Sequence, residues 1–175
     1  MITEKELYEK LKELGIDDYT VKEHPPLFSV EDVIENDCMM PGLNFKNLLI
    51  KDKKAETYYL VILEDSRKME NKYFKGFTGW GKIRFAHSEE LYEKMGLKPG
   101  SVSPYGLLNN EEHDIIIVVD RSISGADKDE LINFHPNRNT ATLTVRKHQF
   151  VKYLESLGNK KSQPHVKRGV FLMRA

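Results

Sequence analysis

A lysine and an asparagine at the start of an apolar run are the first residues in this chain that could do chemistry. Lys46 and Asn47 precede Leu48–Ile50, a run typical of a strand packed on both faces, and a polar turn follows from Lys51 to Lys54. A lysine at a strand end can hold a phosphate or a carbonyl oxygen as a point charge. The alternative is a solvated edge charge that opposes aggregation, so a role for Lys46 depends on what else the chain brings near it.

The loop Gly100–Pro104 is a second candidate. Gly100 lets the backbone approach a ligand closely, Pro104 stiffens the other end, and Ser101 and Ser103 on either side of Val102 have small side chains. A loop of this composition can form the wall of a small, rigid pocket. It is equally consistent with a plain connection between a helix and a strand that ends at Pro104.

Two histidines and one cysteine are further candidates for reactive side chains. His24 and His135 each precede a proline, which restricts the backbone and can hold the ring in a fixed direction, either into a site or in a turn without a role. Cys38 stands beside Met39–Pro41 with no base nearby in the sequence, so a structural thiol is favoured over a nucleophile.

Composition narrows the possible chemistry further. The chain has no Walker loop, dinucleotide fingerprint, zinc-protease helix or nucleophile elbow, so we expect neither a cofactor nor a metal. Its single cysteine excludes an internal disulfide and fits a reducing compartment. Lys and Arg number 27 and Asp and Glu number 27, so any binding of nucleic acid must come from a local basic patch.

The sequence predicts a helix near each end of the chain and shorter helices between them, which help to position these residues. Thr3–Glu6 has the form of a capping box, apolar residues follow on one helical face, and Gly15 is a stop signal. Residues 148–157 have the apolar spacing of a last helix, closed by Gly158. Shorter helices are predicted at 29–36, at 69–74 and from Ser88 to about Gly96.

Apolar runs bounded by turn residues predict the strands. The β-branched run 115–120 suits a buried central position. Two hairpins are predicted, one across the turn at Lys53–Lys54 and one across Pro136–Asn139. The predicted strands are 19–23, 48–50, 58–63, 83–85, 115–120, 131–135 and 140–145.

Length and pattern indicate one compact domain followed by a tail. A chain of 175 residues with 39% hydrophobic content can fill a single core, and we place the domain at 1–158. Residues 159–175 are basic and weakly patterned, which predicts a disordered tail or a docking arm for an anionic partner. The first residues form a charged helix rather than a signal sequence, and no apolar run reaches membrane-spanning length, so we expect a cytoplasmic protein.

Several of these segments together resemble the YbaK/prolyl-tRNA-synthetase-associated family. They occur in the same order and at similar spacing over the chain up to Gly158, and the resemblance is strongest to freestanding deacylases that clear alanine mischarged on proline tRNA. The segments are Glu23–Pro26, Lys46–Leu48, Arg84–Phe85, Pro99–Pro104 and Asn133–Thr142.

The resemblance implies a fold, a reaction and a set of roles. The fold is an α+β domain with a mixed β-sheet flanked by helices, and the reaction is hydrolysis of the ester between an amino acid and the terminal adenosine of a tRNA. Lys46 would hold the 3′ end of the substrate, Gly100 to Pro104 would line the amino-acid pocket, and His135 would shape it. Asn47 and Phe134 are implied as further substrate contacts.

The resemblance also implies partners, and it leaves alternatives open. The acceptor stem and 3′ end of tRNA are implied as partners, with Arg84 and Lys82 expected to contact the stem, and prolyl-tRNA synthetase is a further one. An activated aminoacyl ester can be hydrolysed by a positioned water, the vicinal hydroxyl of the substrate and backbone amides, without a protein nucleophile. The alternatives are a deacylase for cysteine or serine, a binding module without activity, and an enzyme for a small free ester or amide.

Overall fold

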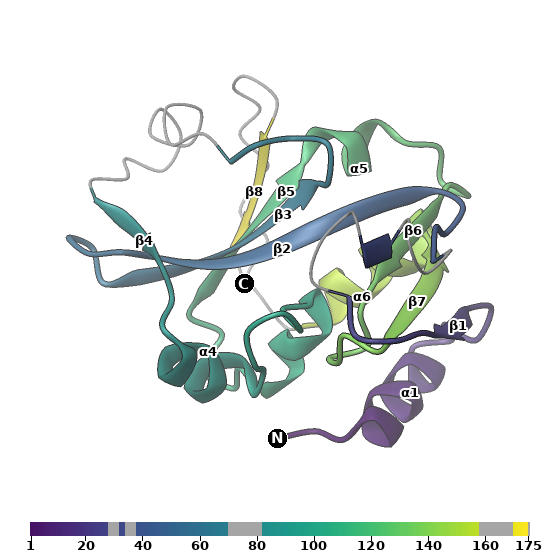
Figure 1. The fold of residues 1–175 in the computed structure, drawn as a ribbon, viewed down its shortest axis with the longest axis horizontal. Helices are drawn as coiled ribbons and strands as arrows, with labels where there is room; N and C mark the ends of the chain where they lie inside the picture. The colour runs from purple at the N-terminus through teal and green to yellow at the C-terminus, as the bar shows by residue number, and fades with distance from the viewer. Residues whose placement is uncertain (28–31, 34–37, 70–81, 158–169, 175) are drawn as a thin grey trace.

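The computed structural model describes residues 1–27, 32–33, 38–69, 82–157 and 170–174 and confirms a mixed sheet with helices packed against it (Figure 1). Within these residues the strands run in the order β1-β7-β6-β2-β3-β5-β8, and β4 also pairs with β2. The strands are β1 (Thr20–Glu23), β2 (Leu43–Asp52), β3 (Thr57–Glu64), β4 (Ile83–Phe85), β5 (Ile115–Asp120), β6 (Leu131–Phe134), β7 (Ala141–Arg146) and β8 (Val170–Arg174). The helices are α1 (Glu4–Glu13), α4 (Ser88–Met95), the 3₁₀ helix η1 (Pro104–Asn109), α5 (Arg121–Gly125) and α6 (Lys147–Ser156).

The hairpin of β2 and β3 is the centre of the sheet, as predicted. Its two strands pair antiparallel from Phe45 opposite Glu64 to Asp52 opposite Thr57. The turn is held by Asp52, whose Oδ1 accepts hydrogen bonds from the backbone N–H of Lys54 at 2.8 Å and of Ala55 at 3.2 Å. A short carboxylate that accepts from the next residues is a common way to close such a turn.

The helices pack on one face of the sheet. Thr3 and Glu6 form the predicted capping box of α1, and Leu7 and Leu11 of that helix are fully buried. Apolar residues of α4, η1, α5 and α6 join the same core, together with alternate residues of β2, β3 and β5. A smaller cluster built on Ile50, Tyr59 and Val61 covers the opposite face. The period-2 alternation of strand side chains explains this division.

The strand β8 is the main departure from the sequence-based expectation. The end of the predicted basic tail, residues 170–174, pairs antiparallel with β5, so β5 lies between β3 and β8. The apolar run Val170–Met173 was the signal for a strand, and the basic residues around it obscured that signal. Two further elements, η1 and α5, were not predicted. Most of the helix expected at 29–36, nearly all of the one at 69–74, and Gly158 lie outside the described residues.

The strand β2 pairs with β3 along one edge, which we call its inner edge. Along the opposite, outer edge its partner changes partway along the strand. Parallel β6 pairs with β2 at Leu43 and Asn44, whereas antiparallel β4 pairs with it from Ile50 to Asp52. Within the described residues, no strand pairs with residues 45–48 on this edge. The sheet therefore has a gap beside the segment that carries Lys46 and Asn47.

Gly42 sets the start of β2 against β6, which gives a test of the fold. Its φ is +93°, and a Cβ there would lie 2.3 Å from the carbonyl oxygen of Leu131. We expect Gly42→Ala to lower the free energy of unfolding by at least about 2 kcal/mol, because a strained backbone and a backbone clash combine. Urea denaturation measures this change.

Gly125 supplies the matched control for that substitution. A Cβ at Gly125 would meet nothing within 4 Å, so Gly125→Ala should leave the unfolding midpoint unchanged or raise it slightly. Equal midpoints for Gly42→Ala and Gly125→Ala would contradict the tight approach of β2 to β6.

Candidate active site

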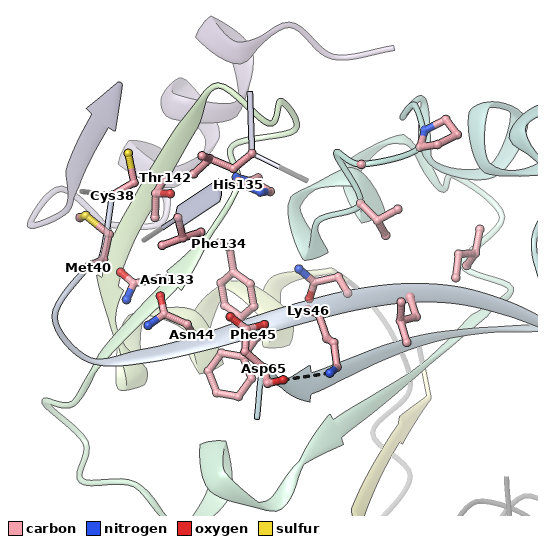
Figure 2. Close-up of a pocket in the computed structure, with 18 of the residues that line it drawn as sticks. Cys38, Met40, Asn44, Phe45, Lys46, Asp65, Asn133, Phe134, His135 and Thr142 are labelled. Carbon is pink, nitrogen blue, oxygen red and sulfur yellow. Dashed lines mark hydrogen bonds between the residues drawn. The ribbon is translucent and has the colours of Figure 1, made fainter. Parts of the chain in front are cut away.

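A pocket of about 780 Å³ lies at the gap in the sheet. Its lining comes from β2, from the strands β6 and β7, from the residues that follow β3, and from the segments 38–40 and 99–102. Asn44, Asn133 and Thr142 lie beside Cys38 and Met40 at one side of it (Figure 2). This volume is within the usual range for small-molecule and cofactor sites.

Lys46 reaches from β2 to the chain just after β3. Its Nζ donates a hydrogen bond to the backbone carbonyl oxygen of Asp65 at 2.9 Å (Figure 2). This contact uses one of the three N–H bonds of the ammonium group and fixes the direction of the side chain. Asp65 is an exposed residue, yet partial burial of its carboxyl raises its pKa, while the positive charge of Lys46 opposes that shift.

His135 follows β6 and lines the pocket as a neutral imidazole. Its Nδ1 donates a hydrogen bond to the backbone carbonyl oxygen of Ala141 at 2.8 Å. Because a carbonyl can only accept, the proton of the neutral ring is on Nδ1 and the lone pair is on Nε2. Burial lowers the pKa of His135 below 6.5, and the hydrogen bond to Ala141 only partly compensates.

His24 packs next to His135 and forms a hydrogen bond with Thr142, and both of these residues line the pocket. The centroids of the His24 and His135 rings are 6.0 Å apart. His24 is buried, and its Nδ1 donates to the carbonyl oxygen of Pro25 at 2.8 Å while its Nε2 lies 2.9 Å from the hydroxyl oxygen of Thr142. Both ring nitrogens therefore have partners within the chain, and His24 holds Thr142 in the pocket lining.

The loop Gly100–Pro104 is divided between the pocket and the core. Gly100, with φ of +86°, and Val102 line the pocket. Ser103 is fully buried and caps η1, since its Oγ accepts from the backbone N–H of Tyr105 at 3.2 Å. Pro104 is the first residue of η1, and its carbonyl oxygen accepts from the Tyr153 hydroxyl at 3.1 Å. Ser101 is half-buried and not part of the lining, so the substrate contacts expected of Ser101, Ser103 and Pro104 stay predictions.

The structure brings Asn47 and Phe134 into the pocket lining but leaves Arg84 outside it. The Oδ1 atom of Asn47 is buried and has no hydrogen-bond partner among the described residues. Phe134 is buried, with its ring centroid 4.6 Å from that of Phe150. Arg84 instead forms an ion pair with Glu90, in which Nη2 donates to Oε1 at 2.6 Å. Its contact with the acceptor stem stays a prediction.

The backbone of β2 also faces the gap. The carbonyl oxygen of Leu49 accepts from the N–H of Ala86 at 2.9 Å, on the outer edge of the strand. The carbonyl oxygen of Asn44 accepts from the N–H of Asp65 at 3.1 Å, on the inner edge. Because the N–H and C=O of one residue in an antiparallel pair point to the same side, and successive residues alternate, the backbone groups of Asn47 point into the gap.

Sequence reasoning missed several polar residues of the lining, including Asp65, Thr142 and Asn133. The Asn133 side chain is buried and donates from Nδ2 to the carbonyl oxygen of Pro41 at 2.9 Å, while its Oδ1 accepts from the Thr144 hydroxyl at 2.6 Å. An asparagine within the apolar strand Leu131–Phe134 was the available signal. Cys38, expected to be structural, is buried and also lines the pocket.

The described residues provide neither a metal site nor a membrane-spanning helix. No group of three or more His, Cys, Asp or Glu side chains in this part of the chain could hold a metal ion. Among the helices that the structure describes, none is long and apolar enough to cross a membrane.

Comparison with known sequences identifies a family. The profile of the family described as "Aminoacyl-tRNA editing domain" matches residues 24–153. The chain is 32% identical over 150 residues to the prolyl-tRNA editing protein ProX of Acetoanaerobium sticklandii, and the match covers 86% of this chain and 89% of that protein. It is also 32% identical over 151 residues to prolyl-tRNA synthetase associated domain-containing protein 1 of Danio rerio, covering 86% of this chain and 80% of the relative.

Comparison with solved structures supports the fold. A crystal structure described as that of a candidate trans-editing enzyme for prolyl tRNA synthetase superposes with a TM-score of 0.65 at 17% identity. The superposition covers 87% of this chain and 92% of that one. At this identity the likeness concerns the architecture of the sheet and helices.

The lowered pKa of His135 predicts how stability depends on pH. Below pH 6.5 the unfolded chain binds a proton at this histidine that the folded chain resists, so the free energy of unfolding should fall as pH is lowered from 7 to 5. The variant His135→Asn keeps a side-chain N–H for Ala141 but has no group that titrates in this range. Its urea midpoint should fall less steeply over the same interval, and parallel curves for the two proteins would contradict the buried, neutral ring.

Proposed function

Because this chain belongs to the aminoacyl-tRNA editing domain family, we propose that it is a trans-editing deacylase that hydrolyses the ester of mischarged tRNA, with alanine on proline tRNA as its substrate. The partner is then the 3′ end and acceptor stem of tRNA. An enzyme of this kind acts where tRNA is charged, so the proposal includes a cytoplasmic location and prolyl-tRNA synthetase as a protein that supplies the mischarged substrate.

One observation carries the proposal. Lys46, Gly100 and His135, which are far apart in the sequence, line a single pocket. An exposed strand-edge lysine, a plain connecting loop and a turn histidine have no reason to meet in one cavity. Their meeting favours the binding interpretation of each residue over its structural alternative.

The pocket has room for more than an amino acid. A cavity of about 780 Å³ is much larger than an alanyl group, so it can also take the nucleoside that carries the ester. We assign Lys46 to the phosphate or carbonyl oxygen near the ester, because a lysine binds such groups as a flexible point charge.

Hydrolysis of the ester then depends on groups that hold the substrate and a water. The backbone N–H of Asn47 faces the gap, and a preorganised amide of this kind can stabilise the oxyanion that forms when water attacks the ester carbon. The lone pair on Nε2 of His135 can accept a hydrogen bond from that water or from a substrate hydroxyl. Because Gly100 has no side chain, the backbone of its loop can also come close to the ester group of the substrate.

Selectivity against proline follows from the rigidity of the wall near His135. Asn133 is tied to Pro41 and Thr144, and Thr142 is tied to His24, so this part of the pocket cannot widen without breaking buried hydrogen bonds. A rigid wall can exclude a side chain larger than alanine, but it cannot strongly reject glycine or serine.

A deacylation panel tests the proposed substrate. Purified protein should release alanine from proline tRNA at least about tenfold faster than it releases proline, because steric exclusion acts against the larger residue. Serine, glycine and cysteine esters of the same tRNA belong in the panel. Faster release of serine or cysteine than of alanine would identify another small amino acid as the substrate, and binding without release of any amino acid would indicate a module without activity.

Substitution of Lys46 tests its assigned role. We expect Lys46→Ala to reduce kcat/KM for the alanyl ester by about a hundredfold, since a charged contact near the reacting ester is lost. Lys46→Arg should retain part of the activity because the positive charge remains. Lys12→Ala, at an exposed position of α1, is the control that should leave the rate unchanged. A normal rate for Lys46→Ala would exclude Lys46 from the reaction.

A further inference from the structure

Three exposed lysines gather at the end of the β2–β3 hairpin. Lys53 and Lys54 are in the turn, and the backbone N–H of Lys53 donates to the carbonyl oxygen of Lys82 at 2.8 Å, which joins the turn to the residue before β4. We call Lys53, Lys54 and Lys82 the lysine cluster. In the described part of the chain, none of the three forms an ion pair.

The acidic residues that the structure describes near the lysine cluster are already engaged. Glu56 pairs with Lys51, with Oε2 2.6 Å from Nζ. Glu90 pairs with Arg84, and the buried carboxylate of Asp52 accepts from the backbone of the turn. The cluster therefore leaves a local positive charge on a chain whose formal net charge is zero.

An exposed aromatic ring lies between this cluster and the pocket. Phe85, the last residue of β4, is 62% exposed and lines the pocket. Met39, on another segment of the lining, is 61% exposed. Single exposed apolar side chains are ordinary, but here two of the largest ones border the same opening. An exposed aromatic ring at such an opening is a surface on which an unpaired base can stack.

The three features follow one another along the sheet. Phe85 pairs with Ile50, and Ile50 is four residues, or about 13 Å of extended strand, beyond Lys46 on β2. Lys82 precedes Phe85 by three residues, or about 10 Å of extended strand. Figure 1 shows β4 at the end of β2 that is remote from β6 and β7. Pocket, ring and lysine cluster thus follow one another in this order along the sheet, leading away from the pocket.

We propose that the lysine cluster and Phe85 form the path of the single-stranded 3′ end of the tRNA as it enters the pocket. The ring of Phe85 stacks on a base next to the ester-bearing nucleoside, and Lys82, Lys53 and Lys54 bind the phosphates that follow. This inference rests on the proposed function for the identity of the RNA. It assigns recognition to these residues, while Arg84 holds β4 against α4 through Glu90.

Removal of the lysine cluster tests the phosphate contacts. The triple variant Lys53→Ala, Lys54→Ala, Lys82→Ala should bind uncharged, fluorescein-labelled proline tRNA at least about tenfold more weakly at low salt, as measured by fluorescence anisotropy. The slope of log Kd against log salt concentration should fall by about 2, since each lost phosphate contact removes about 0.7–0.9. The matched control removes three exposed lysines of α1, Lys5, Lys10 and Lys12, and should bind like the wild type. Equal affinity of the two triple variants would overturn the proposal.

Substitution of Phe85 tests the stacking contact. Phe85→Ala should weaken binding of a short single-stranded RNA ending in CCA by about tenfold, and Phe85→Tyr should restore it, because stacking needs an aromatic face. Equal binding by Phe85→Ala and wild type would overturn the role of the ring. The exposed position of Phe85 predicts unchanged thermal unfolding for both variants, which separates lost stacking from lost folding.

These measurements stand apart from hydrolysis because the RNA is uncharged. If the wild type deacylates alanyl-tRNA but the lysine variant binds like the α1 control, the path is wrong and the proposed function survives. If the wild type binds RNA through the cluster but releases no amino acid from any ester, the path is supported and the proposed function fails. A wild-type protein that binds neither RNA overturns the path.

Discussion

The change of partner along one edge of β2 is the constraint on which the rest of the site depends. A ten-residue strand keeps β3 on its inner edge from Phe45 to Asp52, while its outer edge passes from β6 to β4. A fully paired strand would bury its backbone groups in ladder hydrogen bonds and leave no opening in the sheet. The interruption instead exposes the backbone of Asn47 and separates two groups of strands that can carry different functions. One side supplies His135 and Thr142, and the other supplies Phe85.

Burial and hydrogen bonding distinguish two kinds of polar residue in this region: those that hold the pocket walls in place and those that a ligand can contact. Asn133, Ser103 and His24 have partners within the chain for their side chains, so their contribution is to hold the walls in place. A buried polar group with satisfied bonds rigidifies its surroundings, because moving it would leave donors or acceptors unpaired. Lys46 is bound through a single backbone carbonyl, and Asn47 Oδ1 has no partner in the described part of the chain. Groups with unused bonding capacity at a pocket wall are the ones that a ligand can engage.

The sequence was sufficient for elements whose signal is local. The capping box at Thr3, the β2–β3 hairpin and the β-branched strand β5 were all predicted, because each depends on residues close together in the chain. The gap beside Lys46 depends on the registers of β6 and β4, whose residues are 89 and 31–35 positions away in the sequence from the β2 residues that they pair with, and no local pattern specifies such a register. The burial of Ser103 and the pairing of Arg84 with Glu90 involve residues close together in the sequence, but they depend on how η1, β4 and α4 pack, which the residue types alone do not specify. The strand β8 was missed for a different reason, since its basic surroundings outweighed a short apolar run.

The formal net charge of zero is accompanied by ion pairs within the chain that neutralise cations near the pocket. Most cations near the site are neutralised by carboxylates of the same chain, as Lys51 is by Glu56, Lys94 by Asp114 and Arg84 by Glu90. These pairs stabilise the junction of β2, β4 and α4 without adding to the long-range field. Among the described residues, Lys46 in the pocket and the lysine cluster at the hairpin turn form no ion pair, so their charge is available to an anionic partner. A polyanion attracted by so few contacts binds weakly and leaves quickly. For the proposed substrate, this distribution of charge favours recognition of the 3′ end over recognition of the whole RNA.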